Sequence, residues 1–313
     1  MGAFGLNTAT TESLHPELQT VYSQLQSQLL GKSAVIKQAM ACLLAGGHLL
    51  LEDLPGVGKT SLAKWLGSSF GMSFQRIQFT SDLLPADIIG VSIFEQNEQA
   101  FHFHPGPLFH QLILADELNR ASPRTQSALL EAMEEGQVSV DGVNHTLPSP
   151  FFVIATQNPH EQLGTFELPE SQLDRFAMRL SIGFPDADSE LQMLKQSNHA
   201  ARSDSPLVVE QLPQLQAQSQ QVHASDALLG YLLRLIHASR TLEHARPLSP
   251  RCSKTLLACA RAWAFIHHRQ HVEPEDLQAV FVAVSAHRLG RGEQGVQFAS
   301  QLLDGVAPYN DLE

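Results

Sequence analysis

The chain has 313 residues, of which 43% are hydrophobic, and a formal net charge of −12 with only 20 lysine and arginine residues. This length suits two packed domains, and the acidic balance argues against a broad nucleic-acid-binding surface, which requires a basic patch. The sequence contains no apolar run of about 18 residues, no basic amino-terminal segment and no C-x-x-C pair among its cysteines, so we expect no membrane insertion and a cytoplasmic location.

Residues 49–61 join a short apolar strand to a glycine-containing turn that ends in Gly-Lys-Thr-Ser. Backbone N–H groups of such a loop, at the start of a helix, surround phosphate oxygens, and the helix dipole favours their negative charge. Lys59 would contact the outer phosphates, and the Thr60 hydroxyl would hold Mg²⁺. The alternative is a simple turn before a helix, because Asp53 stands where the pattern G-x-x-x-x-G-K-[ST] requires glycine. The predicted phosphate-binding residues are Pro55, Gly56, Val57, Gly58, Lys59, Thr60 and Ser61.

Residues 111–117 form an apolar run that closes with two carboxylates, a pattern typical of a buried parallel strand. Open α/β sheets bind ligands at the carboxyl ends of their strands. Asp116 would therefore hold Mg²⁺ through its hydration shell, and Glu117 would polarise an attacking water. A strand that ends in solvated acids is common by itself, and the preceding loop favours the catalytic interpretation.

A third apolar strand is predicted over residues 151–156, and polar side chains follow it. Asn158 would orient the water or contact the terminal phosphate. Alone, the sequence Thr-Gln-Asn-Pro would indicate only a turn. Its position as the third element in chain order makes it a candidate.

Two insertions and two histidine pairs complete the local patterns. Residues 80–90 lead into the segment 101–109, and residues 137–147 alternate around an Asp-Gly turn, which predicts a β-hairpin. His102 and His104 would share a strand face, and His267 and His271 would share a helix face. Neither pair has a third ligand in the sequence pattern, so we expect packed or solvated histidines rather than metal sites.

In this order the motifs resemble those of AAA+ ATPases, and more narrowly those of the MoxR family. Residues 51–60 resemble the family's Walker A loop, in which an acidic residue in place of the first glycine is familiar. The other matching segments are the helix-2 insert (80–109), the Walker B extension (115–121), the pre-sensor 1 hairpin (137–147), sensor 1 (155–159), the arginine-finger segment (168–176) and sensor 2 (248–251).

The resemblance implies an α/β fold. It predicts a P-loop αβα sandwich with a mostly parallel five-stranded sheet, followed by a smaller, all-helical lid domain at the carboxyl end. We place the domains at residues 1–185 and 186–313, because a Phe-Pro-Asp turn near residue 185 marks the exit from the sheet. The glutamine-rich stretch 211–221 is predicted to be a short connection and a helix.

The resemblance also implies ATP and Mg²⁺ as cofactors and a homo-oligomer, most simply a hexameric ring. In such a ring Arg175 of one subunit would reach the triphosphate bound by its neighbour; the alternative is that Arg175 pairs with Asp174 or Glu170 on a solvated helix. Arg120 is a second candidate for a contact between subunits. Arg251, at the start of a helix, would contact the γ-phosphate.

Gly31 belongs to the segment that resembles the family's adenine-binding region. The function implied for the chain is ATP hydrolysis that remodels or activates a protein partner, often a von Willebrand factor A domain protein. Two alternatives stay open: a motor subunit of a chelatase-like complex that inserts metal cofactors, and a nucleotide-dependent scaffold with little hydrolysis.

Overall fold

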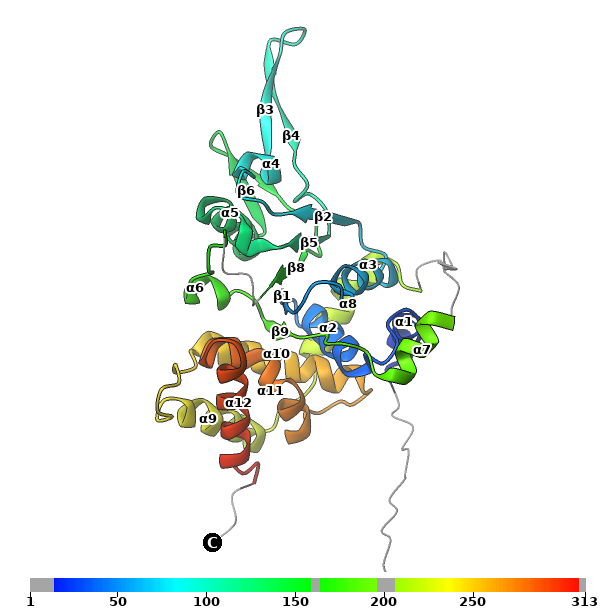
Figure 1. The fold of residues 1–313 in the computed structure, drawn as a ribbon, viewed down its shortest axis with the longest axis vertical. Coiled ribbons are helices and arrows are strands. Elements are labelled where there is room, and N and C mark those ends of the chain that lie inside the picture. The colour runs from blue at the N-terminus through cyan, green and yellow to red at the C-terminus, as the bar shows by residue number, and fades with distance from the viewer. Residues whose placement is uncertain (1–13, 159–163, 196–205, 310–313) are drawn as a thin grey trace, which may run out of the picture.

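The computed structural model describes residues 14–158, 164–195 and 206–309 (Figure 1). Its centre is a five-stranded sheet with the strand order β2-β5-β8-β1-β9, and every strand pairing within this sheet is parallel. The predicted fold class is thus confirmed. The strands are β1 (Leu49–Glu52), β2 (Phe74–Gln78), β5 (Leu112–Asp116), β8 (Phe152–Gln157) and β9 (Met178–Leu180).

Helices cover both faces of this sheet because its strands are apolar on both sides. In β1, Leu49 and Leu51 belong to a hydrophobic cluster with helices α2 and α3, whereas Leu50 belongs to a second cluster with helix α5. These helices and the one preceding them are α1 (Pro16–Gln28), α2 (Ser33–Leu44), α3 (Lys59–Ser69) and α5 (Pro123–Glu135). The two clusters fix the sheet between helical layers and align the carboxyl ends of its strands.

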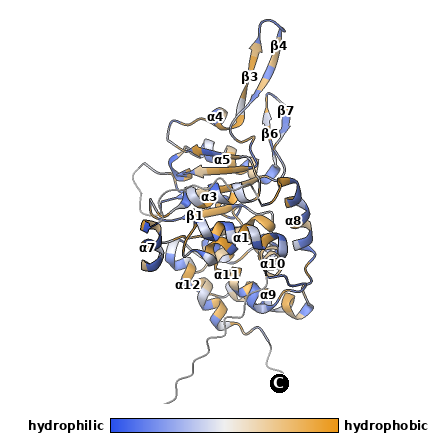
Figure 2. Ribbon diagram, turned by 90° about the vertical axis from the view of Figure 1, so that its right-hand side faces the viewer, coloured by the Kyte–Doolittle hydropathy of each residue, from blue (hydrophilic) through white to orange (hydrophobic). Residues whose placement is uncertain are grey.

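Two antiparallel hairpins project from one end of the sheet (Figures 1 and 2). The longer hairpin contains β3 (Gly90–Glu95) and β4 (Ala100–Pro105) and follows the short helix α4 (Pro85–Ile89). The shorter one contains β6 (Gln137–Val140) and β7 (Val143–Thr146). Its turn has left-handed backbone at Asp141 and Gly142, with φ angles of 51° and 78°. This conformation favours the Asp-Gly pair and confirms the predicted hairpin.

All the regular elements that the structure describes after β9 are helices. The glutamine-rich stretch contains helix α8, as predicted, and α10 and α11 pack against each other. These elements share a hydrophobic cluster with α1, α2 and β1, so the boundary at residue 185 stays a prediction. They are α7 (Ala187–Lys195), η2 (Val209–Gln211), α8 (Leu212–Gln220), α9 (Asp226–Ser239), α10 (Pro250–Ile266), α11 (Pro274–Leu289) and α12 (Gly292–Gly305); η1 (Leu118–Arg120) and α6 (Glu170–Leu173) precede β9.

One predicted helix face is wrong. Helix α10 ends at Ile266, and His271 lies beyond it in an isolated bridge with His223, so His267 and His271 do not share a helix face. His271 instead pairs with Glu273 at 3.3 Å. Among the described helices, none combines the length and apolar character that a membrane crossing requires.

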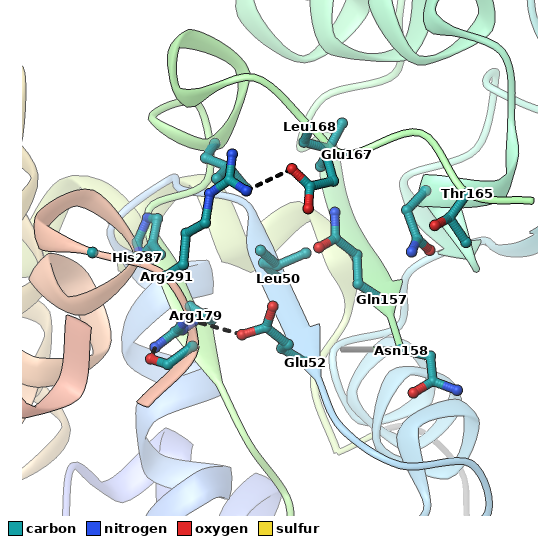
Figure 3. A pocket seen from close by; sticks show the side chains of 14 residues that line it. Leu50, Glu52, Gln157, Asn158, Thr165, Glu167, Leu168, Arg179, His287 and Arg291 are labelled. Atoms are coloured by element: carbon teal, nitrogen blue, oxygen red, sulfur yellow. Dashed lines mark hydrogen bonds and ion pairs between the residues drawn. The ribbon is translucent and has the colours of Figure 1, made fainter. Parts of the chain in front are cut away.

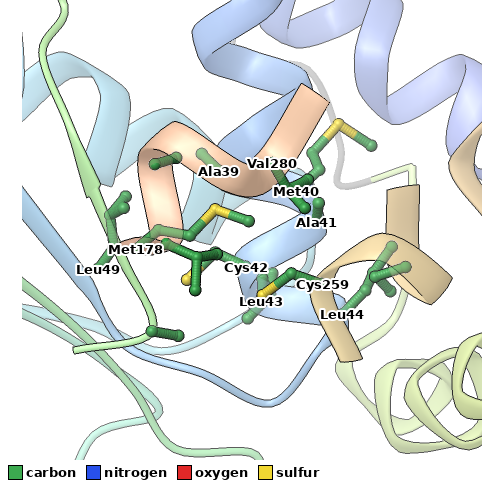
Figure 4. Packing of buried hydrophobic residues seen from close by; sticks show 14 of the residues in the cluster. Ala39, Met40, Ala41, Cys42, Leu43, Leu44, Leu49, Met178, Cys259 and Val280 are labelled. Atoms are coloured by element: carbon green, nitrogen blue, oxygen red, sulfur yellow. The ribbon is translucent and has the colours of Figure 1, made fainter. Parts of the chain in front are cut away.

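The three cysteines are buried packing residues, and Figure 4 shows two of them, Cys42 and Cys259. Cys42 and Cys259 lie in the cluster that also contains Met178 of β9. Burial raises the pKa of Cys252 to about 11 and that of Cys259 to about 12. The thiols therefore stay protonated at neutral pH and act as small apolar side chains.

Candidate functional site

The predicted phosphate-binding loop connects β1 to α3 and lies at the surface. Gly56 and Gly58 have φ angles of 85° and 100°, a conformation that L side chains rarely adopt. No atom lies within 4 Å of a Cβ built at either glycine, so the loop faces open space. Lys59 Nζ donates a hydrogen bond to the Asp53 carbonyl oxygen at 2.6 Å, and Thr60 is exposed at the start of α3. The backbone here has the curvature and the free surface that a polyphosphate needs.

Asp53, the departure from the glycine pattern, is a buried structural residue. Its carboxylate accepts hydrogen bonds from the Ser181 hydroxyl at 3.0 Å and from the backbone N–H groups of Ile182 and Gly183, the latter at 2.9 Å. These donors follow β9, which pairs with β1 in parallel. The aspartate therefore ties the start of the loop to the segment that leaves the sheet.

Gly31 lies beside that same segment. Its φ is 72°, and a Cβ there would come within 2.5 Å of Ser189 Oγ and 2.9 Å of Asp186 Oδ2. Next to it, Lys32 Nζ donates to the carbonyl oxygens of residues 182, 183 and 184 at 2.7–3.0 Å. Close packing against the start of α7 thus explains the glycine, and a contact with adenine stays a prediction.

Asp116 lies at the carboxyl end of β5, as the sequence predicted. Its Oδ1 accepts a hydrogen bond from Thr156 Oγ1 at 2.6 Å, and its Oδ2 accepts two from Arg76, with Nη2 at 2.6 Å and Nε at 3.0 Å. Arg76 comes from the neighbouring strand β2. The guanidinium thus neutralises the carboxylate proposed for Mg²⁺.

Glu117 begins the turn after β5 with left-handed backbone, at a φ of 57°. Its N–H donates to Thr156 Oγ1 at 2.9 Å, and its Oε2 accepts a hydrogen bond from Gln78 Nε2 at 2.9 Å. Arg120 Nη1 lies 3.4 Å from the same oxygen. Two neighbouring strands and η1 therefore fix the candidate catalytic carboxylate, and Arg120 faces it within one protomer.

Asn158 follows β8 and lines a cavity of about 590 Å³ between the sheet and the helices near the carboxyl end (Figure 3). Two ion pairs lie in this cavity: Arg179 with Glu52 at 2.8 Å and Arg291 with Glu167 at 2.6 Å. None of the predicted phosphate-binding residues lines it. The cavity thus borders the predicted site at Asn158 without containing the loop.

Arg251, the arginine predicted for sensor 2, does not lie beside the phosphate-binding loop. Arg251 and Arg175 both bind Glu134, at 2.5 Å and 2.9 Å, and the three residues line a second cavity together with Gly46 and Gly47. These glycines precede β1, whereas the loop follows it, and β1 alone spans about 13 Å. The packing of α10 on α2 directs the start of α10 to the amino-terminal ends of the strands, so Arg251 does not lie beside the loop of its own protomer. Its contact with a γ-phosphate stays a prediction.

Arg175 does not use either acidic partner considered from the sequence. Asp174 binds Arg288 at 2.6 Å, and Glu170 binds Arg246 at 3.0 Å. Arg175 also donates to the Leu130 carbonyl oxygen at 2.5 Å. Its guanidinium is thus held against the carboxyl-terminal half of α5.

Sequence reasoning missed several polar residues of this region. Three of them lie in strands and one in a helix, and no local sequence pattern sets them apart from neighbouring polar residues. A search for polar side chains near the ends of the strands is the signal that would have found them. These residues are Arg76, Gln78, Glu134 and Thr156.

Comparison with known proteins agrees with this architecture. A family described as "ATPase family associated with various cellular activities (AAA)" matches residues 48–178, and the AAA lid domain matches residues 243–303. Chaperone MoxR1 of Mycobacterium tuberculosis is 36% identical, with 87% of this chain and 75% of that protein covered. The protein MoxR of Paracoccus denitrificans is 30% identical over 88% of this chain and 89% of its own length. The chain belongs to the MoxR family of AAA ATPases.

Two further relatives extend across nearly the whole of this MoxR-family chain. The uncharacterized protein YeaC of Bacillus subtilis is 44% identical over 90% of this chain and 89% of its own length. A crystal structure from Cytophaga hutchinsonii superposes with a TM-score of 0.84 at 32% identity, over 93% of this chain and 94% of that one. The nucleotide-binding core and the lid therefore occur together in proteins of similar length.

Proposed function

We propose that this MoxR-family ATPase hydrolyses ATP with Mg²⁺ at sites between adjacent subunits of a ring, and uses the reaction to remodel or activate a protein partner. The observation that carries the proposal is the position of the two arginines. Arg175 and Arg251 share Glu134 near the amino-terminal ends of the strands, and the loop lies at the carboxyl end of β1. In the structure these groups do not face the loop of their own protomer, whereas a head-to-tail neighbour can present them to it.

The residues around the loop fit ATP and Mg²⁺. The open glycine conformations at Gly56 and Gly58 present backbone N–H groups, and Lys59 supplies a cation. The Thr60 hydroxyl and the Asp116 carboxylate are the oxygen donors that Mg²⁺ prefers. When bound, Mg²⁺ neutralises charge on the phosphate oxygens. Asp116 must then exchange Arg76 for the hydrated ion.

Within this arrangement Glu117 polarises the attacking water, and Asn158 orients it. Gln78 and Arg120 hold the Glu117 carboxylate in the structure described here. Arg175 and Arg251 of the adjacent subunit would stabilise the charge that develops on the transferred phosphoryl group. Arg251 thereby receives a role across the interface.

The hairpins support a protein as the partner. Phe101 is 72% exposed and Phe94 is 49% exposed on the β3–β4 hairpin, and Val143 is exposed on the β6–β7 hairpin. Exposed apolar side chains on projecting elements are typical of protein-binding surfaces. The relative MoxR1 is named a chaperone, which is in keeping with such a client.

Mixed rings test the proposal. Lys59→Ala, Arg175→Ala and Arg251→Ala should each lose turnover, since each lacks one half of every site. Mixing Lys59→Ala with either arginine variant should restore part of the turnover, because some junctions then join an intact loop to an intact arginine. Arg240→Ala, an exposed arginine at the end of α9, is the matched control and should retain turnover.

The assembly of the mixed rings is verified by native mass spectrometry of differently labelled subunits. No restored turnover in rings shown to contain both variants would contradict the shared site. Restored turnover with the Arg175 variant alone would support Arg175 and remove Arg251 from the proposal.

A further inference from the structure

The tip of the β3–β4 hairpin gathers two carboxylates and two imidazoles on one side. Glu95 and Glu98 stand at the two ends of the turn, closed by a hydrogen bond from the Glu98 N–H to the Glu95 carbonyl oxygen at 3.2 Å. His102 and His104 follow on β4, two residues apart and therefore on one face. The sequence pattern offered only the histidine pair, and folding of the hairpin adds the two acidic residues.

The donor atoms of this cluster converge. His102 Nε2 lies 2.7 Å from Glu98 Oε2, and His104 Nε2 lies 3.9 Å from Glu95 Oε1. One donor atom each of Glu95, Glu98 and His102 lies within 4.8 Å of the other two. Around a tetrahedral zinc ion with ligands at about 2.0–2.1 Å, neighbouring donors stand about 3.4 Å apart. His104 lies outside this group of three, and its Nε2 faces Glu95 Oε1 from the next position on the same strand face.

From this geometry we propose that the hairpin tip is a binding site for a divalent transition-metal ion of the zinc class, with Glu95, Glu98, His102 and His104 as ligands. Nitrogen donors in two of four positions favour zinc and its neighbours over Mg²⁺ and Ca²⁺, which prefer oxygen ligands alone. A dication also neutralises the two carboxylates. The site is separate from β5, the strand that ends at Asp116, which lies in the sheet below the hairpin (Figure 1).

The register of the hairpin keeps this cluster apart from the aromatic residues. Phe94 pairs with Phe101, and their rings are 5.2 Å apart, while Ile93 pairs with His102. Because alternate residues of a strand face opposite sides, the metal ligands and the phenylalanines occupy opposite faces. A bound ion would therefore stiffen the tip without covering Phe94 and Phe101.

Isothermal titration of untagged, nucleotide-free protein with ZnCl₂, after removal of metal with EDTA, tests the site. We expect one zinc ion per chain at the tip. His102→Ala and His104→Ala should each weaken binding by at least about tenfold, since the loss of even an outer-shell partner costs that much. Glu95→Gln and Glu98→Gln should weaken it too, because each removes a carboxylate charge. Circular dichroism and gel filtration verify that each variant folds.

The matched control is His271→Ala, which removes a histidine from a surface pair with Glu273; among the described residues this pair belongs to no group of three converging ligand side chains. Asp116→Asn serves as the control for the predicted Mg²⁺ site. Both should bind zinc as the wild type does. Titration with Co²⁺ reports the ligands, because thiolate coordination would add a charge-transfer band that nitrogen and oxygen ligands do not give.

Three results would overturn the proposal. They are a wild type that binds no zinc, a His102→Ala/His104→Ala double variant that binds it with unchanged affinity, and a cobalt-thiolate band. Each of them removes the ion from the hairpin tip, whether or not ATP is hydrolysed at the sheet.

Discussion

The Asp53 carboxylate joins the predicted phosphate-binding loop to the segment that follows β9. It accepts hydrogen bonds from one hydroxyl and two backbone N–H groups within residues 181–183. Lys32 holds the carbonyl oxygens of residues 182–184 from the other side. A single side chain thus fixes the loop and the exit from the sheet together, a task that a glycine at this position cannot perform.

The change Asp53→Gly restores the common loop pattern, and we expect it to destabilise the protein. Three donors lose a charged acceptor, and glycine adds freedom to the unfolded chain, so the free energy of unfolding should fall by about 2–4 kcal/mol. Urea unfolding followed by circular dichroism measures this. Asp53→Asn keeps one oxygen acceptor and should lose less. An Asp53→Gly variant as stable as the wild type would show that these hydrogen bonds contribute nothing.

His48 is a buried imidazole whose protonation opposes folding. The Val153 N–H donates to its Nδ1 at 3.1 Å, so Nε2 carries the proton and donates to the Met133 carbonyl oxygen at 3.2 Å. Burial lowers the pKa of His48 from 6.5 to about 4. Between these pH values the unfolded state binds a proton that the folded state does not.

We therefore expect the free energy of unfolding to fall as the pH is lowered from 6.5 to about 4, with His48 contributing about 3 kcal/mol of the decrease. Urea unfolding at a series of pH values measures it. His48→Asn is less stable at neutral pH and should lack this part of the pH dependence. Burial also lowers the pKa of His287, which is present in both proteins and cancels in their difference. Parallel pH curves for the two proteins would refute the assignment.

At the scale of elements, an aromatic contact connects the two hairpins. The Phe103 ring of β4 stacks on the His145 ring of β7, with centroids 3.9 Å apart and planes at 21°. Phe103 also contacts Phe109 at 5.5 Å, next to the sheet. The two ring contacts therefore join the hairpins to each other and to the segment that leads into β5.

Replacing His145 with alanine should uncouple the hairpins. We expect faster amide hydrogen exchange in β3, β4, β6 and β7 and unchanged exchange in the five-stranded sheet, because the stack lies outside the main core. A double-mutant cycle with Phe103→Leu should give a coupling of about 0.5–1.5 kcal/mol. Thr146→Ala, an exposed neighbour on β7, is the control. Equal exchange in the His145 and Thr146 variants would mean that the hairpins are independent.

At the scale of the whole molecule, the loop and the two arginines lie at opposite ends of the strands of one sheet. The core, the lid and both hairpins surround this sheet, and the arginines are held by Glu134 at the end of α5. Under the proposed function, another copy must dock before these arginines can reach a loop.

ATP turnover per subunit should therefore rise with protein concentration and reach a plateau once assembly is complete. A dilution series of turnover, with light scattering at the same concentrations, measures the dependence. Arg175→Ala should stay low throughout, because assembly then brings no arginine finger to the loop. Constant turnover per subunit in samples shown to be monomeric would place the whole site within one chain.

The amino-acid sequence by itself predicted β1, β5 and β8 of the sheet, the order of the motifs and the turn of the β6–β7 hairpin, because these depend on local patterns. Apolar runs predict buried strands, carboxylates after a strand mark its ligand-binding end, and the Asp-Gly pair fits the left-handed turn at residues 141 and 142. The prediction of a phosphate-binding loop at residues 49–61 likewise needed only local features, namely the glycines and the start of a helix.

Only the tertiary structure decided which distant side chains meet. Arg251 and Glu134 are 117 residues apart in the chain, and Asp53 and Ser181 are 128 residues apart. Such pairs depend on how helices pack against the sheet, which no local pattern encodes. The same reason explains why Arg251 lies beside Glu134, since packing between elements fixes that position.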